Sequence, residues 1–131
     1  MNSCFQKETA RVLADWDGTI KMRSVRSNLN LRELLEPLPC GDDFVPLCFR
    51  WNGSSSGIFQ FGWVFNFPRW KHPIASCRHD WRCAIAKNKE ERRIADELFR
   101  EDIGIGGTKW EQRKGYWGVR LGALLGIGNN F

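Results

Sequence analysis

One stretch of the chain, residues 51–99, most constrains the fold, because its hydrophobic pattern changes from that of strands to that of helices. It begins with a glycine- and serine-rich turn (WNGSSSG) and an aromatic run (IFQFGWVFNF). After Pro68, apolar residues recur every three or four positions in two successive segments, which is the spacing of amphipathic helices. Strand patterns therefore precede helix patterns, an order typical of α+β domains.

The 131 residues are predicted to form a single α+β domain, in which a small antiparallel sheet is packed by about three C-terminal helices. The sheet is expected to begin with an N-terminal hairpin made by residues 11–16 and 19–25. Asp17 and Gly18 separate these two runs, and both residue types tolerate the positive φ of a tight hairpin turn.

Other segments of the N-terminal half are assigned from composition. Residues 45–51 and 58–67 are predicted as two aromatic-rich strands, the second of them covered on both faces. Residues 27–36 fit either the end of a strand or a short helix, and the prolines that follow end it. Residues 1–9 are polar and are expected to be flexible or to be held by a partner.

Three helices are predicted from their start signals. The first begins near Pro73, because proline suits the first turn of a helix. The second follows Asn88, whose side chain can cap free backbone N–H groups. The third begins at Thr108, which forms a capping box with Glu111, and it runs to about residue 125.

Glycines and apolar residues give further detail on these helices. The glycine-rich residues 103–107 are predicted to break the chain between the second and third helices. On the third helix, four apolar residues share one face and are expected to pack on the core: Trp110, Trp117, Leu121 and Leu124.

Charge and cysteine content exclude several classes of protein. The net charge is +5, but basic residues are scattered and often stand beside acids, so nucleic-acid binding is not expected. No apolar run reaches the roughly 20 residues of a membrane span, and the first residues lack the apolar core of a signal peptide. Five cysteines, an odd number, are expected to be reduced thiols rather than a disulfide framework.

The first candidate site contains His79, Asp80 and Asp96. A histidine with two carboxylates can bind a divalent metal ion or act as a general acid and base. The alternative is structural: the carboxylates form ion pairs with nearby helix arginines such as Arg92, and His79 makes a hydrogen bond.

Two other candidate sites involve cysteine and serine. His79 and Cys83 are four residues apart on a predicted helix and face the same way, which suits metal ligation. Ser55 lies at the centre of a Gly-x-Ser-x-Gly pattern, but a nucleophilic serine of that type is followed by a helix, and here a strand is predicted to follow.

The aromatic surplus points to either a core or an interface. Five rings alternate along the predicted strand of residues 58–67, so they share one face, and Trp16 belongs to the predicted hairpin. This is a large apolar area for one small sheet, and part of it could contact a partner or a second copy. The candidate interface residues are Trp16, Phe59, Phe61, Trp63, Phe65 and Phe67.

Several short motifs follow one another between residues 45 and 125. Phe49 precedes the turn WNGSSSG; then come HD at residues 79–80, ADELF at 95–99 and VRLG at 119–122. In this order the chain resembles a tailed-bacteriophage family known only as domain of unknown function 1353. That family has a phenylalanine, an Asp-x-x-Ser-x-Pro turn, a His-Asp pair, an Ala-Asp-x-x-Phe helix and a closing Val-Arg-x-x-Gly helix.

The chain departs from this family pattern at the turn. Ser55 aligns with the family serine, but Asn52 stands in the place of the aspartate and Gly57 in the place of the proline. In VRLG the glycine also comes one residue early. Without the turn aspartate the chain lacks a negatively charged ligand or base there. Asn52, with Gly53 and Ser55, is expected to hold the loop by hydrogen bonds.

The resemblance and the aromatic surplus together predict a structural or interaction component of a tailed-phage virion, in the tail, baseplate or neck. It would bind other phage structural proteins or further copies of itself, with the region of His79, Asp80 and Asp96 locking the sheet to the helices. This interpretation requires no cofactor. One alternative is a small hydrolase that uses these three residues and a divalent metal. Another is a host-directed phage protein that is absent from the particle.

Overall fold

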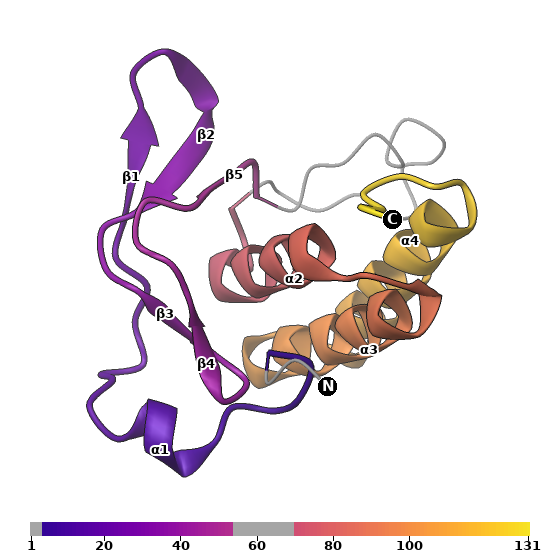
Figure 1. Ribbon diagram of the computed structural model, residues 1–131, viewed down its shortest axis with the longest axis horizontal. Coiled ribbons are helices and arrows are strands. Elements are labelled where there is room, and N and C mark those ends of the chain that lie inside the picture. The colour runs from indigo at the N-terminus through magenta and orange to yellow at the C-terminus, as the bar shows by residue number, and fades with distance from the viewer. Residues whose placement is uncertain (1–3, 54–69) are drawn as a thin grey trace.

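The computed structural model describes residues 4–53 and 70–131. Within them, helices and two small antiparallel sheets form the predicted α+β fold. In chain order the elements are α1 (Ala10–Leu13), β1 (Met22–Val25), β2 (Asn28–Leu34), β3 (Leu38–Cys40), β4 (Asp43–Val45), β5 (Arg50–Trp51), α2 (Pro73–Ile85), α3 (Lys89–Gly106) and α4 (Lys109–Leu124). Figure 1 shows the strands on one side of the molecule, α2 in the middle, and α3 and α4 beyond it.

The two sheets are short and pack on α2. In the three-stranded sheet, β2 lies between β1 and β5, with Met22 opposite Leu34 on one side and Arg32 opposite Trp51 on the other. β3 and β4 pair separately. The largest buried cluster joins both sheets to α2 and to the N-terminal segment, and its members are Cys4, Leu34, Leu38, Cys40, Val45, Trp51 and Cys77.

The three predicted helices are confirmed, together with their start signals. Pro73 is the first residue of α2, where its missing N–H costs no helical hydrogen bond. The Asn88 side chain accepts a 2.9 Å hydrogen bond from the N–H of Glu91 at the start of α3. Thr108 and Glu111 form the predicted capping box, with the Glu111 N–H donating to Thr108 Oγ1 at 3.1 Å.

The break predicted at residues 103–107 is mostly wrong, because α3 continues to Gly106. Ile103 is fully buried, and its contacts outweigh the low helix propensity of the neighbouring glycines. The helix ends where the N–H of Gly107 donates to the carbonyl of Ile103 at 2.8 Å.

The predicted N-terminal hairpin is displaced along the chain. Residues 11–16 are not a strand: their first half belongs to α1, and the hairpin formed by β1 and β2 turns at residues 26–27. Gly18 has a positive φ of 84°, but Asp17 does not share it, so the turn is not of the hairpin type. Instead the Asp17 carboxylate accepts hydrogen bonds from the backbone N–H and the hydroxyl of Thr19.

Of the two predicted aromatic-rich strands, only residues 45–51 can be compared with the structure. Residues 45–51 were predicted as one strand, but β4 ends at Val45 and β5 begins at Arg50. Pro46 removes a ladder donor, and Cys48 has a φ of 71°, which no strand tolerates. Residues 27–36 contain β2, so the strand interpretation of that segment is confirmed. Residues 58–67 lie outside the described residues.

The prediction for the face of α4 is wrong. The side chains expected in the core lie outside it: Trp110 is 59% exposed, Trp117 is 61% exposed and Leu124 is 79% exposed, while Leu121 is half-buried. Glycines allow α4 to approach its neighbours closely, so the small residues face inward and the rings project outward. The buried glycines are Gly115, Gly118 and Gly122.

The N-terminal segment is held by the chain itself. Cys4 and Phe5 are buried, although residues 1–9 were expected to be flexible or to need a partner. The carbonyl of Cys4 accepts a 2.7 Å hydrogen bond from Nε of Arg82 on α2, and the N–H of Thr9 donates to the carbonyl of Gly41 at 3.1 Å. Composition could not predict this, because the contacts span more than thirty residues of sequence.

Candidate functional site

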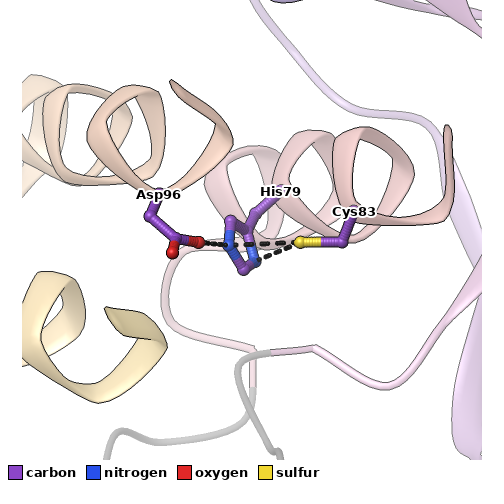
Figure 2. Close-up of side chains that lie close together, drawn as sticks. All are labelled: His79, Cys83 and Asp96. Carbon is purple, nitrogen blue, oxygen red and sulfur yellow. Dashed lines mark hydrogen bonds and ion pairs between the residues drawn. The ribbon is translucent and has the colours of Figure 1, made fainter. Parts of the chain in front are cut away.

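Three of the predicted site residues meet between α2 and α3. His79 and Cys83 lie one turn apart on α2, and Asp96 comes from α3 (Figure 2). The imidazole Nε2 is 2.7 Å from Asp96 Oδ1, and Cys83 Sγ is 3.5 Å from the same nitrogen. All three residues are buried, so the cluster is an interior site rather than an open cleft.

Asp96 is the centre of the cluster. Its side chain has no exposed surface, and its two oxygens also accept hydrogen bonds from Arg92 Nε at 3.0 Å and from Arg120 Nη1 at 2.8 Å. One carboxylate therefore binds side chains of α2, α3 and α4. The pairing with Arg92, one turn before Asp96, is the structural alternative that the sequence suggested.

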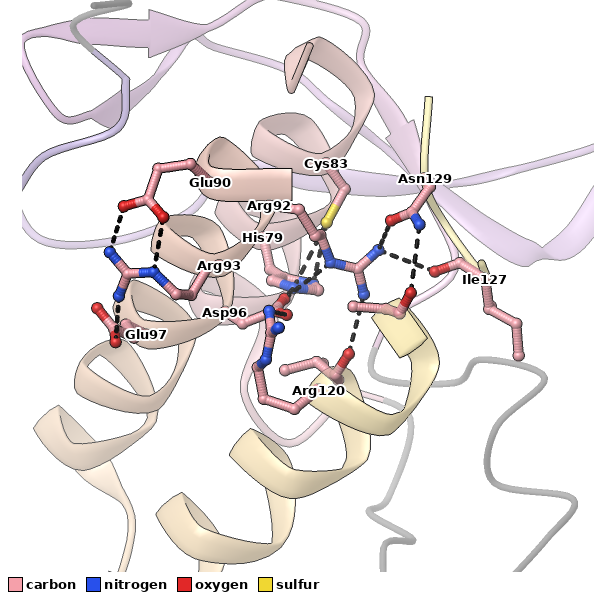
Figure 3. A network of polar contacts seen from close by, with 12 residues as sticks. His79, Cys83, Glu90, Arg92, Arg93, Asp96, Glu97, Arg120, Ile127 and Asn129 are labelled. Carbon is pink, nitrogen blue, oxygen red and sulfur yellow. Dashed lines mark hydrogen bonds and ion pairs between the residues drawn. The ribbon is translucent and has the colours of Figure 1, made fainter. Parts of the chain in front are cut away.

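Arg92 extends the network to the end of the chain (Figure 3). Its Nη1 donates to the carbonyl of Ile127 at 2.8 Å and to the side-chain oxygen of Asn129 at 3.0 Å, and its Nη2 donates to the carbonyl of Val119 at 3.0 Å. The guanidinium thus joins α3, α4 and the C-terminal tail through three part-buried hydrogen bonds.

The charge of His79 follows from its neighbours. Burial disfavours the imidazolium, but the nearby Cys83 and the carboxylates of Asp80 and Asp96 outweigh this, and the pKa of His79 is raised well above its usual value. A protonated His79 donates a charge-assisted hydrogen bond to Asp96. His79 and Asp96 then form a stabilising ion pair, and the protonated His79 cannot accept a proton as a general base.

The proposed ligand set of His79, Asp80 and Asp96 does not converge on one point. Asp80 Oδ1 lies 3.8 Å from Nδ1 of His79, whereas Asp96 contacts Nε2. The two ring nitrogens point in different directions, so a single ion cannot bind both carboxylates next to this ring. Within the described chain, Asp80 has no arginine within ion-pair distance, contrary to the structural alternative for this residue.

The second predicted set, His79 and Cys83, is better assembled, and the structure adds Asp96 to it. Donor atoms of His79, Cys83 and Asp96 all lie within 4.8 Å of one another, and imidazole, thiolate and carboxylate are the ligands of zinc. Both oxygens of Asp96, however, already contact guanidinium groups. A cation would have to displace or tolerate Arg92 and Arg120, so the residues present fit a metal ion poorly.

The remaining candidates are dispersed. Trp16 is half-buried, donates from its indole N–H to the carbonyl of Thr19 at 2.7 Å, and packs against the main core. Asn52 is half-buried beside Gly53, whose φ of 73° favours glycine. The others lie outside the described residues: Ser55, Phe59, Phe61, Trp63, Phe65 and Phe67.

A second buried network was not predicted from the sequence. Arg78 and Arg82 of α2 face two acids, Glu8 of the N-terminal segment and Asp102 of α3. The shortest contact joins Arg82 Nη2 and Glu8 Oε2 at 2.8 Å, and Arg78 Nη1 lies 3.1 Å from both acids. Two arginines one turn apart on a predicted helix were the only sequence signal, and it does not identify their partners.

Asp102 is expected to make stability depend on pH. Burial raises the pKa of its carboxyl to about 6, although Arg78 and Arg82 act in the opposite direction. The folded protein therefore holds this proton more tightly than the unfolded chain does. The resulting stabilisation is complete below about pH 4 and is lost as the pH rises through 6. We expect a decrease on the order of 2–3 kcal/mol from this group.

Urea unfolding between pH 4 and pH 7 checks this expectation. Between pH 4 and pH 7 the free energy of unfolding should fall more for the wild type than for Asp102→Asn, in which the titrating group is absent. The matched control is Glu101→Gln, because Glu101 is the next carboxylate on α3 and is half exposed. Parallel curves for the wild type and Asp102→Asn would show that the Asp102 carboxyl titrates normally.

Comparison of the chain with protein-family models, with curated proteins and with solved structures finds no match. Among the described helices, none has the length and apolar content needed to cross a bilayer.

Proposed function

We propose that this chain is a structural, protein-binding component of a tailed-phage particle, in its tail, baseplate or neck. The observation that carries the binding role is the outward face of α4, where Trp110 and Trp117 are each about 60% exposed. They lie seven residues apart and Leu124 a further seven, so the three side chains follow one line along the helix. Exposed tryptophans aligned in this way are typical of the anchor residues of protein interfaces.

The interior site supports a binding role over catalysis. His79, Asp96 and Arg92 bind one another and lock three helices and the C-terminal tail together. A general base needs a free lone pair and access to substrate. A buried, raised-pKa histidine that donates to an aspartate has neither. The assignment to a phage particle rests on the motif resemblance alone.

Mass spectrometry of purified particles, combined with variants of α4, tests this proposal. We expect the chain in the particle at a fixed copy number, and incorporation of a Trp110→Ala/Trp117→Ala double variant to fall by about tenfold or more. Leu29→Ala is the matched control, because Leu29 is 76% exposed on β2, far from α4 in the sequence. Absence from the particle, or equal incorporation of the double variant and the control, would contradict the proposal.

A small metal-dependent hydrolase is the second candidate. The set expected for it, His79, Asp80 and Asp96, does not converge, so its metal would have to be held by His79, Cys83 and Asp96, which lie close together. Metal analysis of the purified chain separates it from the first. A structural role predicts substoichiometric zinc and equal unfolding midpoints with and without a chelator. Stoichiometric zinc that is lost in Cys83→Ser, with the fold intact, would favour the hydrolase.

A further inference from the structure

A small basic cavity lies where the start of α3, the end of α4 and the C-terminal tail meet. Its volume is about 150 Å³, which is large enough for a small ion with a few waters and too small for a nucleotide. Its lining residues are Lys89, Arg92, Arg120, Ala123, Leu124, Asn129 and Phe131.

The charges around this cavity do not balance. Three cationic side chains line it, and in the described chain only Asp96 places a carboxylate within ion-pair distance of Arg92 and Arg120. Lys89 has no such partner among the described residues. Among the side chains, three cations and one carboxylate leave an excess of two positive charges, without counting His79. The guanidinium groups of Arg92 and Arg120 are buried or partly buried, where an uncompensated charge is costly, and a bound anion reduces that cost.

The hydrogen-bond donors are unequally used. The Arg92 side chain is 5% exposed and donates four hydrogen bonds, to Asp96, Val119, Ile127 and Asn129. These bonds fix its position. Among the described residues, Arg120 uses one of its five donors, in the bond to Asp96. The cavity thus combines a rigid cation with a second guanidinium and a lysine that have donors left to offer.

The direction of α3 also favours an anion in this cavity. Lys89 is the first residue of α3, so the positive end of the helix dipole lies at the cavity. The acids of this first turn are engaged elsewhere. Glu90 pairs with Arg93, and Glu91 accepts from the backbone N–H of Lys87 at 2.8 Å.

We propose that this cavity binds a small dianionic oxyanion of the phosphate class, held by Lys89 and Arg120 above the fixed guanidinium of Arg92. A tetrahedral dianion neutralises the excess of two charges and accepts from both side chains at once. The source is either free inorganic phosphate or the phosphoryl group of a larger molecule. The inference does not rest on the proposed function, although Leu124 of the α4 face also lines the cavity.

Isothermal titration calorimetry with inorganic phosphate, at constant ionic strength set by chloride, tests the proposal. We expect saturable binding of one phosphate per chain and a rise in melting temperature that follows the same saturation. Phenyl phosphate, a monoester, distinguishes the two sources: equal or tighter binding indicates a phosphoryl group on a larger ligand, and exclusion indicates free phosphate.

Variants of single cations locate the site. Lys89→Ala is expected to weaken phosphate binding by about tenfold or more, because it removes a charged hydrogen-bond donor. It should leave the fold intact, since Lys89 is exposed. Lys109→Ala is the matched control, because Lys109 is an exposed lysine that likewise begins a helix, here α4. No saturable binding by the wild type, or equal binding by the two variants, would overturn the proposal.

Discussion

Asp96→Ala should lower the free energy of unfolding by about 3–5 kcal/mol, because it removes one partner from a buried ionic network. The carboxylate has no exposed surface and accepts from His79, Arg92 and Arg120. Its loss leaves three buried or partly buried donors without an acceptor. A domain of this size is typically stable by about 5–15 kcal/mol, so the variant should be only marginally folded.

Urea unfolding followed by circular dichroism measures this loss, and Asp96→Asn separates charge from shape. The amide keeps the size of the carboxylate but presents N–H donors to cationic neighbours, so most of the loss should remain. Glu97→Ala is the matched control, because Glu97 is the next residue on α3 and its ion pair with Arg93 is partly exposed to solvent. That variant should cost about 1 kcal/mol or less. Equal losses for Asp96→Ala and Glu97→Ala would mean that the network does not hold the helices together.

The features that were predicted correctly are those encoded by residues close together in the sequence. Pro73, Asn88 and the Thr108–Glu111 capping box each act on backbone groups within one helical turn. Their effect does not depend on what the helix later packs against. The starts of α2, α3 and α4 therefore follow from the sequence alone.

Features that depend on tertiary packing were predicted less well. A stripe such as Trp110, Trp117 and Leu124 has the right spacing for a core face, but spacing does not show which face meets the rest of the protein. On α4 the close approach uses Gly115 and Gly118 instead. The Asp17-Gly18 turn likewise has hairpin composition, yet the run before it starts in α1, which ends at Leu13, and forms no strand.

In the candidate site, too, contacts within one helix could be predicted and contacts between helices could not. His79 with Cys83 and Arg92 with Asp96 are each four residues apart on a helix, so their proximity could be predicted. Arg120 reaches Asp96 from α4, a separation that no local rule covers. This distant contact occupies the second oxygen of Asp96 with a guanidinium, which is why the carboxylate that the sequence suggested as a metal ligand fits a metal ion poorly.

The second large effect is expected for Arg82→Met, which keeps the length of the side chain and removes the guanidinium. Arg82 is fully buried and donates to the carbonyls of Cys4 and Gln6, besides its ion pairs with Glu8 and Asp102. The substitution leaves the buried carbonyl of Cys4, the carbonyl of Gln6 and two carboxylates short of a donor. A loss of about 3–5 kcal/mol is therefore expected.

The segment in which hydrogen exchange increases distinguishes Arg82→Met from Asp96→Ala. Arg82 holds residues 4–8 against α2, so hydrogen exchange should increase first in that segment and in the buried surface beneath it, while the contact between α3 and α4 stays protected. Arg26→Met, at an exposed arginine in the β1–β2 turn, is the matched control and should change neither stability nor exchange. If exchange instead rises uniformly across the chain, the N-terminal segment is part of one cooperative unit with the helices. In that case Cys4 and Phe5 belong to the indispensable core, because the helices cannot stay folded once the segment has left.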